Sequence, residues 1–130
     1  MKALGYAMFV GEYPRLLIEQ RVGLRYKPDL VAPGGGAEAA GARFAFWGEC
    51  GMVTMRKVAW LLKHGQVARL VLFKTGCSTA ALARELREAT GERERAGRRL
   101  QLVNFVPDIA DRAGPDIPAV PASWYTLTTI

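Results

Sequence analysis

The sequence has few of the residues that bind zinc or form disulfide bonds. Its 130 residues include two cysteines, Cys50 and Cys77, and one histidine, His64. These three residues do not supply the four nitrogen and sulfur ligands of a structural zinc site. Two separated cysteines also favour a reduced protein, so we expect a cytoplasmic location rather than a secreted disulfide scaffold.

Long apolar segments are also missing. No run approaches the roughly 18 residues that a membrane-spanning helix needs. The opening stretch MKALGYAMFVGEYPRLL lacks the apolar core and cleavage site of a signal peptide. We therefore expect no membrane partner. Because 50% of the residues are hydrophobic and 23% are charged, the composition is that of a globular protein, and the length predicts one domain over 1–130.

A complete nucleotide-binding P-loop is absent. The stretch APGGGAEAAGA (32–42) lacks the lysine and the Ser/Thr that hold phosphates in such a loop, and we interpret 33–42 as a flexible loop between two strands. A turn at Gly76 and Ser78 precedes a predicted helix, whose first N–H groups can hold a phosphate. A small phosphate- or nucleotide-binding α/β protein therefore remains one alternative.

Acidic residues are fewer than basic ones. The sequence has 18 Lys and Arg against 12 Asp and Glu, which gives a net charge of +6. A positive protein attracts polyanions, because its field steers phosphate chains and their binding releases counterions. Nucleic acid, with DNA as the first candidate, is therefore one expected partner; the alternative is that the positive charge serves solubility alone.

The apolar pattern predicts an α/β domain with a mixed sheet, mostly parallel at its centre and flanked by helices. The expected elements are a helix at 12–23, strands at 24–32 and 43–50, a helix at 54–65, a strand at 68–75, a helix at 78–90 and a strand at 100–107. The strand–helix–strand units should cross over right-handed and pair in parallel. Residues 3–10 fit a strand or the lead-in to a helix, 107–122 should be irregular, and 123–130 can add an edge strand.

Two of the predicted strands each carry a carboxylate. Asp29 lies in YKPDLVAP (26–33), and Glu49 lies in FWGECG (46–51). If these strands pair antiparallel, both carboxylates can converge on one face of the sheet. Mg²⁺ prefers oxygen ligands and keeps several waters, and a bound metal can polarise a phosphodiester and activate a water. The pair predicts a Mg²⁺ site that also accepts Mn²⁺; the alternative is two solvent-facing surface charges.

Two cations, Arg56 and Lys57, begin the helix that follows Glu49. The helix dipole disfavours positive charge in the first turn, at a cost of a few tenths of a kcal/mol on an exposed surface. Nearby carboxylates or phosphates would offset this cost. We therefore favour a position of these cations close to the carboxylates, while an ordinary surface helix is the alternative.

The order of the predicted elements resembles the PD-(D/E)XK nuclease superfamily, whose restriction-endonuclease-like core runs helix-strand-strand-helix-strand-helix-strand. The stretch PDLV…FWGECGMVTMRKVAWLLKHGQVARLVLFKTG is similar to the YaeQ-like branch of that superfamily. In that branch a Pro-Asp-Leu strand, a Trp-x-Glu-x-Gly strand and a helix with an Arg/Lys pair precede an apolar strand. The likeness covers residues 12–106 in topology and 28–76 in motifs.

The resemblance implies that Asp29 and Glu49 are metal ligands and that the Cys50 carbonyl is a third ligand. In active members of the superfamily, a lysine two positions after the glutamate orients the attacking water. Gly51 occupies that position here. The resemblance therefore implies either a Mg²⁺-dependent nuclease with a relocated cation or a nuclease fold without activity that binds nucleic acid or protein.

Several other residues become candidates for the site through this resemblance. Lys57 is the preferred replacement for the missing lysine, with Arg56 and Lys27 as the other candidates. Glu12 and Glu19, on the predicted first helix, can supply a further ligand, as this helix does in some relatives. We group Lys27, Arg56, Glu12 and Glu19 as candidate substrate contacts. Many restriction-like folds act as dimers, so a homodimer is also compatible with the resemblance.

Overall fold

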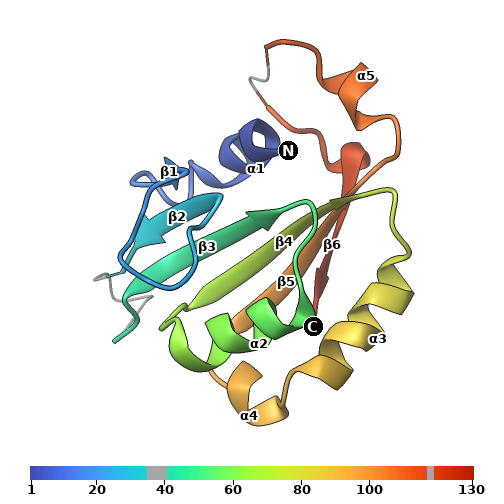
Figure 1. Ribbon diagram of the computed structural model, residues 1–130. Coiled ribbons are helices and arrows are strands. Elements are labelled where there is room, and N and C mark those ends of the chain that lie inside the picture. The colour runs from blue at the N-terminus through green and yellow to red at the C-terminus, as the bar shows by residue number, and fades with distance from the viewer. Residues whose placement is uncertain (35–40, 117–118) are drawn as a thin grey trace.

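A mixed sheet forms the centre of the computed structural model, which describes residues 1–34, 41–116 and 119–130 (Figure 1). Its strands, in spatial and chain order, are β1 (Leu17–Ile18), β2 (Leu30–Pro33), β3 (Phe44–Cys50), β4 (Arg69–Thr75), β5 (Arg99–Phe105) and β6 (Tyr125–Thr129). The β3–β4 and β4–β5 pairs are parallel, and the other three are antiparallel. The α/β class and the mixed sheet are confirmed, but the sheet is less parallel than predicted.

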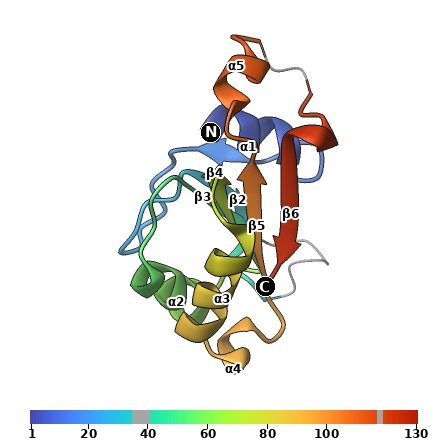
Figure 2. The same ribbon diagram turned by 90° about the vertical axis from the view of Figure 1, so that its right-hand side faces the viewer.

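Helices cover both faces of this sheet (Figure 2). The crossover helices α2 (Met55–His64) and α3 (Thr79–Ala89) lie on one face, and α4 (Glu92–Arg95) follows α3. The helices α1 (Lys2–Phe9) and α5 (Ile109–Ala113) contribute to the apolar cluster on the opposite face. Among the described residues, no helix is long and apolar enough to cross a membrane.

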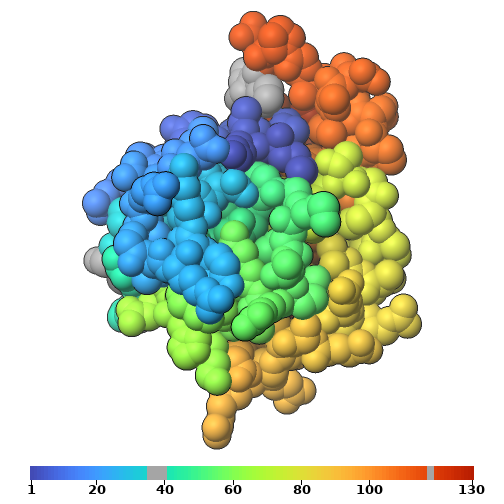
Figure 3. Space-filling view, viewed as in Figure 1, coloured from blue at the N-terminus to red at the C-terminus, as the bar shows by residue number. Residues whose placement is uncertain are grey.

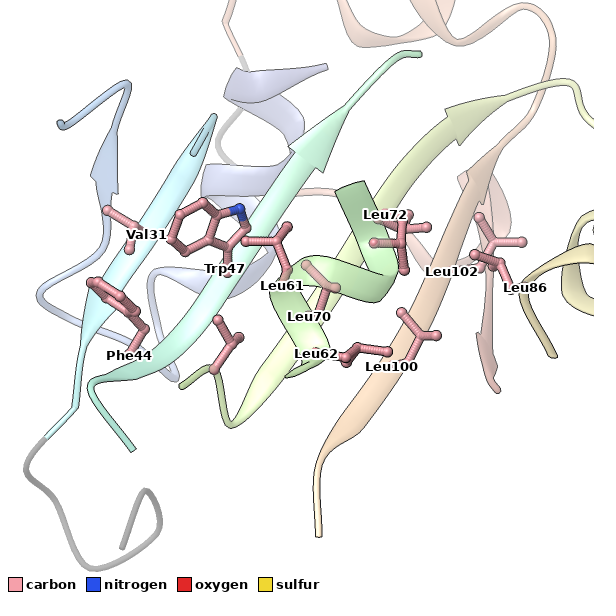
Figure 4. Close-up of a cluster of buried hydrophobic side chains, with 12 residues drawn as sticks. Val31, Phe44, Trp47, Leu61, Leu62, Leu70, Leu72, Leu86, Leu100 and Leu102 are labelled. Carbon is pink, nitrogen blue, oxygen red and sulfur yellow. The ribbon is translucent and has the colours of Figure 1, made fainter. Parts of the chain in front are cut away.

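The sheet separates two apolar clusters, because side chains alternate between the faces along each strand. Leu70 and Leu72 belong to the cluster under α2 and α3, while Val71 and Phe73 belong to the cluster under α1. Figure 4 shows the first cluster, in which Trp47 from β3 lies with leucines from α2 and the neighbouring strands. The near-continuous apolar run of β4 therefore fills both clusters, as expected for a strand buried on both faces.

The helix that we predicted at 12–23 is wrong. This region contains turns and the short strand β1, and the helix of this part of the chain is α1, at Lys2–Phe9. Glu19 has a backbone φ of 54° and Gly23 a φ of 75°, both outside the helical region. The apolar stripe of 12–23 is only partial, and pairing of β1 with β2 takes the place of helix formation.

The strand predicted at 24–32 is shorter than expected. Only Leu30–Pro33 forms β2, and residues 24–29 are irregular. Pro28 lies in this irregular stretch and has no N–H to donate to a neighbouring strand. Part of the expected loop at 33–42, residues 35–40, lies outside the described residues. The stretch 107–122, expected to be irregular, includes α5, and residues 117–118 of it are not described.

The remaining elements were predicted within a few residues of their observed ends. They are β3, α2, β4, α3, β5 and β6. The Thr54 and Ser78 hydroxyls accept hydrogen bonds from the backbone N–H groups of Lys57 and Ala81, and so cap α2 and α3 as the sequence indicated.

Candidate functional site

The antiparallel pairing of β2 and β3 brings Asp29 beside Glu49. Leu30 is in register with Gly48, so Asp29 precedes β2 at the point where β3 ends. The Oδ2 atom of Asp29 accepts a hydrogen bond from the Cys50 N–H at 2.7 Å. The pairing on which the expected convergence of the two carboxylates depends is therefore present.

This end of the sheet is also where parallel strands terminate. β3 ends at Cys50 and β4 at Thr75, so their carboxyl ends lie together. In open α/β sheets, ligands bind outside the carboxyl ends of the strands. The two carboxylates therefore lie at the end of the sheet where open α/β folds usually bind ligands.

Glu49 is a buried carboxylate with two protein partners. Glu49 is 4% exposed. Its Oε1 atom accepts a hydrogen bond from Trp47 Nε1 at 2.8 Å and forms an ion pair with Lys57 Nζ at 2.9 Å. Burial raises the pKa of the Glu49 carboxyl, although the bonds from Trp47 and Lys57 oppose that shift. The charged form is thus costly here, and an additional cation would favour it.

The second carboxylate oxygen of Glu49, Oε2, has no hydrogen-bond partner among the described residues. Over the same residues, every side-chain nitrogen or oxygen that is cut off from solvent has a partner. Solvent therefore reaches Oε2. An accessible, unpaired oxygen on a largely buried carboxylate is suited to receive a cation or a proton.

We predict that Glu49 titrates above 4.5, its ordinary pKa, in a carbon-13 NMR titration. Because Lys57 lowers this pKa, Lys57→Met should raise the midpoint further, whereas Lys63→Met, at the exposed end of α2, should leave it unchanged. The folded protein holds this proton more tightly than the unfolded chain does. The Glu49 contribution to stability is therefore complete below pH 4.5 and falls as the pH rises through the folded pKa. A midpoint at or below 4.5 would contradict this environment.

Lys57 lies between the carboxylate and an aromatic ring. Its Nζ atom is 2.9 Å from Glu49 Oε1 and 5.1 Å from the centre of the Tyr26 ring. In the space-filling view, the segment before Asp29 (blue) adjoins the surface of α2 (green), in line with this contact (Figure 3). The cation in the first turn of α2 thus has a carboxylate nearby, as the sequence interpretation favoured. Arg56 is exposed on the same turn.

Lys2, at the start of α1, joins the site without having been predicted. Its Nζ atom lies 3.4 Å from Asp29 Oδ1 and pairs with the Glu19 carboxylate. These two acidic groups raise the pKa of Lys2, and the bond from Lys2 lowers the pKa of Glu19. Glu19 is therefore adjacent to Asp29 through Lys2, and the exposed Lys27 is close enough to lower the Glu19 pKa as well.

Lys74 is the second cation that the sequence reasoning missed. It extends from β4, and its ammonium donates a hydrogen bond to the Gly51 carbonyl. Gly51 has a φ of 78°, a conformation that favours glycine, so a lysine at this position would be strained. The cation near the position of the missing lysine is therefore supplied by the neighbouring strand.

Glu12 does not join the site. Its Oε2 atom pairs with Arg69 Nη1 at 2.9 Å. Arg69 begins β4, at the opposite end of the strand from Lys74. The expectation that Glu12 and Glu19 share one helix near Asp29 was therefore wrong, because that helix is absent and only Glu19 lies beside Asp29.

Cys50 can contribute its backbone but not a reactive thiol. Burial raises the pKa of the thiol to about 12, and the side chain packs against the cluster under α1. In an extended residue the N–H and C=O point to the same side. Because the Cys50 N–H points to Asp29, its carbonyl is directed to the same side of β3.

The donor set at this edge fits Mg²⁺ better than zinc. In the described part of the chain, no three or more His, Cys, Asp and Glu side chains cluster as metal ligands. The available oxygens are those of Asp29, Glu49 and the Cys50 carbonyl. Mg²⁺ is commonly held by one or two carboxylates and retains several waters, so this small set is adequate for it.

The turn at Gly76, the basis of the phosphate-binding alternative, is occupied by protein contacts. The Asn104 side chain accepts a hydrogen bond from the Cys77 N–H at 3.2 Å and donates to the Cys77 carbonyl at 2.8 Å and to Thr79 Oγ1 at 3.1 Å. Ser78 caps the N–H of Ala81. These bonds give the turn a structural role, so the turn supports the phosphate-binding alternative less strongly.

Two solved structures share this fold. The YaeQ protein from Xanthomonas axonopodis pv. citri has a TM-score of 0.58 and 17% identity, covering 89% of this chain and 59% of its own. The YaeQ protein from Pseudomonas syringae has a TM-score of 0.56 and 14% identity, covering 98% of this chain and 68% of its own. No protein-family model and no curated protein matches the sequence. The chain therefore has a YaeQ-like fold and spans 59% of the length of the first of these proteins.

Proposed function

We propose that this protein belongs to the PD-(D/E)XK nuclease superfamily and hydrolyses phosphodiesters of nucleic acid with Mg²⁺ in the cytoplasm. The observation that carries the proposal is the placement of Asp29 beside Glu49 at the carboxyl ends of the parallel strands, with Lys57 paired to Glu49 and Lys74 bonded to the Gly51 carbonyl. Carboxylates to hold a metal and cations to face a phosphate are the parts that metal-assisted hydrolysis requires.

Asp29, the Oε2 atom of Glu49 and the Cys50 carbonyl would hold the metal. When bound, Mg²⁺ polarises the phosphodiester and lowers the pKa of a coordinated water. Glu49 is already ordered for this role, because Trp47 and Lys57 fix its Oε1 atom. Mn²⁺ is the expected substitute, since it also accepts carboxylate, carbonyl and water ligands.

Two lysines can perform the role of the lysine that is missing at position 51, where this chain has Gly51. Lys57 is the first candidate, because its ammonium forms an ion pair with Glu49, a carboxylate that would hold the metal. Lys74 is the second, through its bond to the Gly51 carbonyl. A cation at either place can orient an attacking water or stabilise the charge that develops on the phosphate.

Nucleic acid is the proposed substrate because of the charge around this edge. Lys27 and Arg56 are exposed there, and the whole protein carries a net charge of +6. Contacts between such cations and phosphates are salt-dependent and carry no sequence information. DNA is the first candidate substrate.

A second candidate is a nuclease fold that binds nucleic acid without cleaving it. The absence of a lysine at Gly51 favours this function. Lys2 and Lys57 also partly neutralise Asp29 and Glu49 without a metal. In this case exposed cations such as Lys27 and Arg56 would hold phosphates, and the carboxylates would only position Lys2 and Lys57.

Incubation of the protein with circular DNA and with structured RNA tests the first candidate. We expect strand cleavage that requires Mg²⁺, stops with a chelator and resumes when excess Mg²⁺ is added. Binding measured in the same buffers separates the two candidates. Salt-sensitive binding without cleavage would establish the binding module, and neither binding nor cleavage would contradict both.

A further inference from the structure

The two outer strands of the sheet differ in how well they resist pairing with another chain. β1 has two residues and lies between Arg15 and Glu19, and short strands with nearby charges protect an edge. β6 has five residues and no charge, and no charged residue occurs between 117 and 130. β6 is therefore the unprotected edge of the sheet (Figure 2).

The backbone of β6 presents a defined set of groups on its open side. The Val106 N–H donates to the Trp124 carbonyl at 2.9 Å, and the Ile130 N–H donates to the Leu100 carbonyl at 2.8 Å. Since successive residues of a strand direct these groups to opposite sides, even-numbered residues of β6 face β5. The N–H and C=O groups of Tyr125, Leu127 and Thr129 therefore point outward, and no described strand pairs with them.

We propose that the outer edge of β6 binds the same edge of a second copy of this chain, so that the two sheets become continuous. An antiparallel pair with its two-fold axis at Leu127 places Leu127 against itself and Tyr125 against Thr129 of the partner strand. In this register each strand's three outward N–H and three outward C=O groups all obtain partners. A shift of the axis to Thr126 or Thr128 leaves the outward groups of one terminal residue unpaired.

The side chains fit this register as well as the backbone does. Leu127 is 47% exposed on an edge strand, and pairing would place the two copies of it against one another. Tyr125 would face Thr129, and aromatic and β-branched residues make favourable cross-strand pairs. Because the strand is uncharged, the two-fold axis brings no like charges together, although each chain has a net charge of +6.

Sedimentation of the full chain over a range of concentrations tests the pairing, with two matched variants. Leu127→Lys places two ammonium groups across the axis and should raise the dimer dissociation constant roughly tenfold or more, since like charges directly opposite each other are destabilising. Leu17→Lys is the control, because Leu17 is equally exposed, at 47%, on the other outer strand. A monomeric wild type, an unaffected Leu127→Lys or a dissociated Leu17→Lys would overturn the proposal.

Amide hydrogen exchange on the wild type provides a readout that needs no variant. At concentrations that favour the dimer, the amides of Tyr125, Leu127 and Thr129 should be protected. On dilution these three should exchange faster, while those of Thr126 and Thr128 stay protected by β5. If the protection of these three amides does not change with concentration, something other than a second copy covers the edge, and the proposed pairing is overturned.

Discussion

Replacing Asp29 with asparagine is expected to lower Mg²⁺-dependent cleavage at least about 100-fold, because even outer-shell changes at metal sites cost about 10–100-fold. Asparagine removes the negative charge but keeps an oxygen that can accept the hydrogen bond from the Cys50 N–H. The fold should therefore be retained. Initial cleavage rates at saturating Mg²⁺, with circular dichroism spectra of each variant, measure the effect.

Asp108→Asn is the matched control for this experiment. Asp108 is about half exposed and pairs with Arg112 at 2.9 Å, and in the described part of the chain it forms no hydrogen bond or ion pair with Asp29, Glu49 or the lysines bound to them. Its replacement should leave the cleavage rate within about twofold of the wild type, because exposed ion pairs contribute little. Equal losses in both variants would show that the effect of Asp29→Asn does not come from the site.

Replacing Trp47 with alanine is expected to lower the free energy of unfolding by about 3–5 kcal/mol, the usual cost of removing a large buried aromatic side chain. Trp47 is fully buried and packs against Phe44 at 5.4 Å between ring centres. The substitution would leave a cavity between β3 and α2. Urea denaturation followed by circular dichroism measures the loss.

Trp47→Phe separates packing from the hydrogen bond to Glu49. Phenylalanine keeps much of the aromatic volume but removes the indole N–H that lies 2.8 Å from Glu49 Oε1. The loss of stability should therefore be smaller than in Trp47→Ala. Because the bond from Trp47 lowers the Glu49 pKa, the pKa should rise further in Trp47→Phe. An unchanged Glu49 titration would mean that Trp47 only packs.

The central part of the fold could be read from the sequence because its signals are local. β4 is an apolar run, and α2 and α3 each combine an apolar stripe with a hydroxyl cap. Such signals fix an element without information from distant residues. The pairing of the strands with Asp29 and Glu49 then followed from their order in the chain and their alternating pattern.

Residues 12–23 were misread because tertiary contacts decide their structure. Leu17 and Ile18 suit a helical stripe, yet they are extended and pair with Val31 and Leu30. The positive φ of Glu19 breaks any helix at this point, and no local pattern announces it. Pairing with β2 thus overrides local helix preference here.

Two cations of the candidate site were also beyond local reasoning. Lys2 reaches Asp29 because α1 packs against the sheet, and Lys74 reaches Gly51 because β4 lies parallel to β3. These pairs are distant in the chain, and only the arrangement of elements brings them together. Lys57 was found because cations in the first turn of a helix call for a compensating charge.

The central claim is that Asp29 and Glu49 form a site for Mg²⁺. Calorimetric titration of the folded protein with Mg²⁺, and separately with Mn²⁺, tests it most directly. The wild type should bind one ion per chain, and Asp29→Asn combined with Glu49→Gln should abolish binding, while both amides keep acceptor oxygens for the Cys50 and Trp47 N–H groups. A wild type that binds neither ion, or a double variant that binds as the wild type does, would contradict the claim.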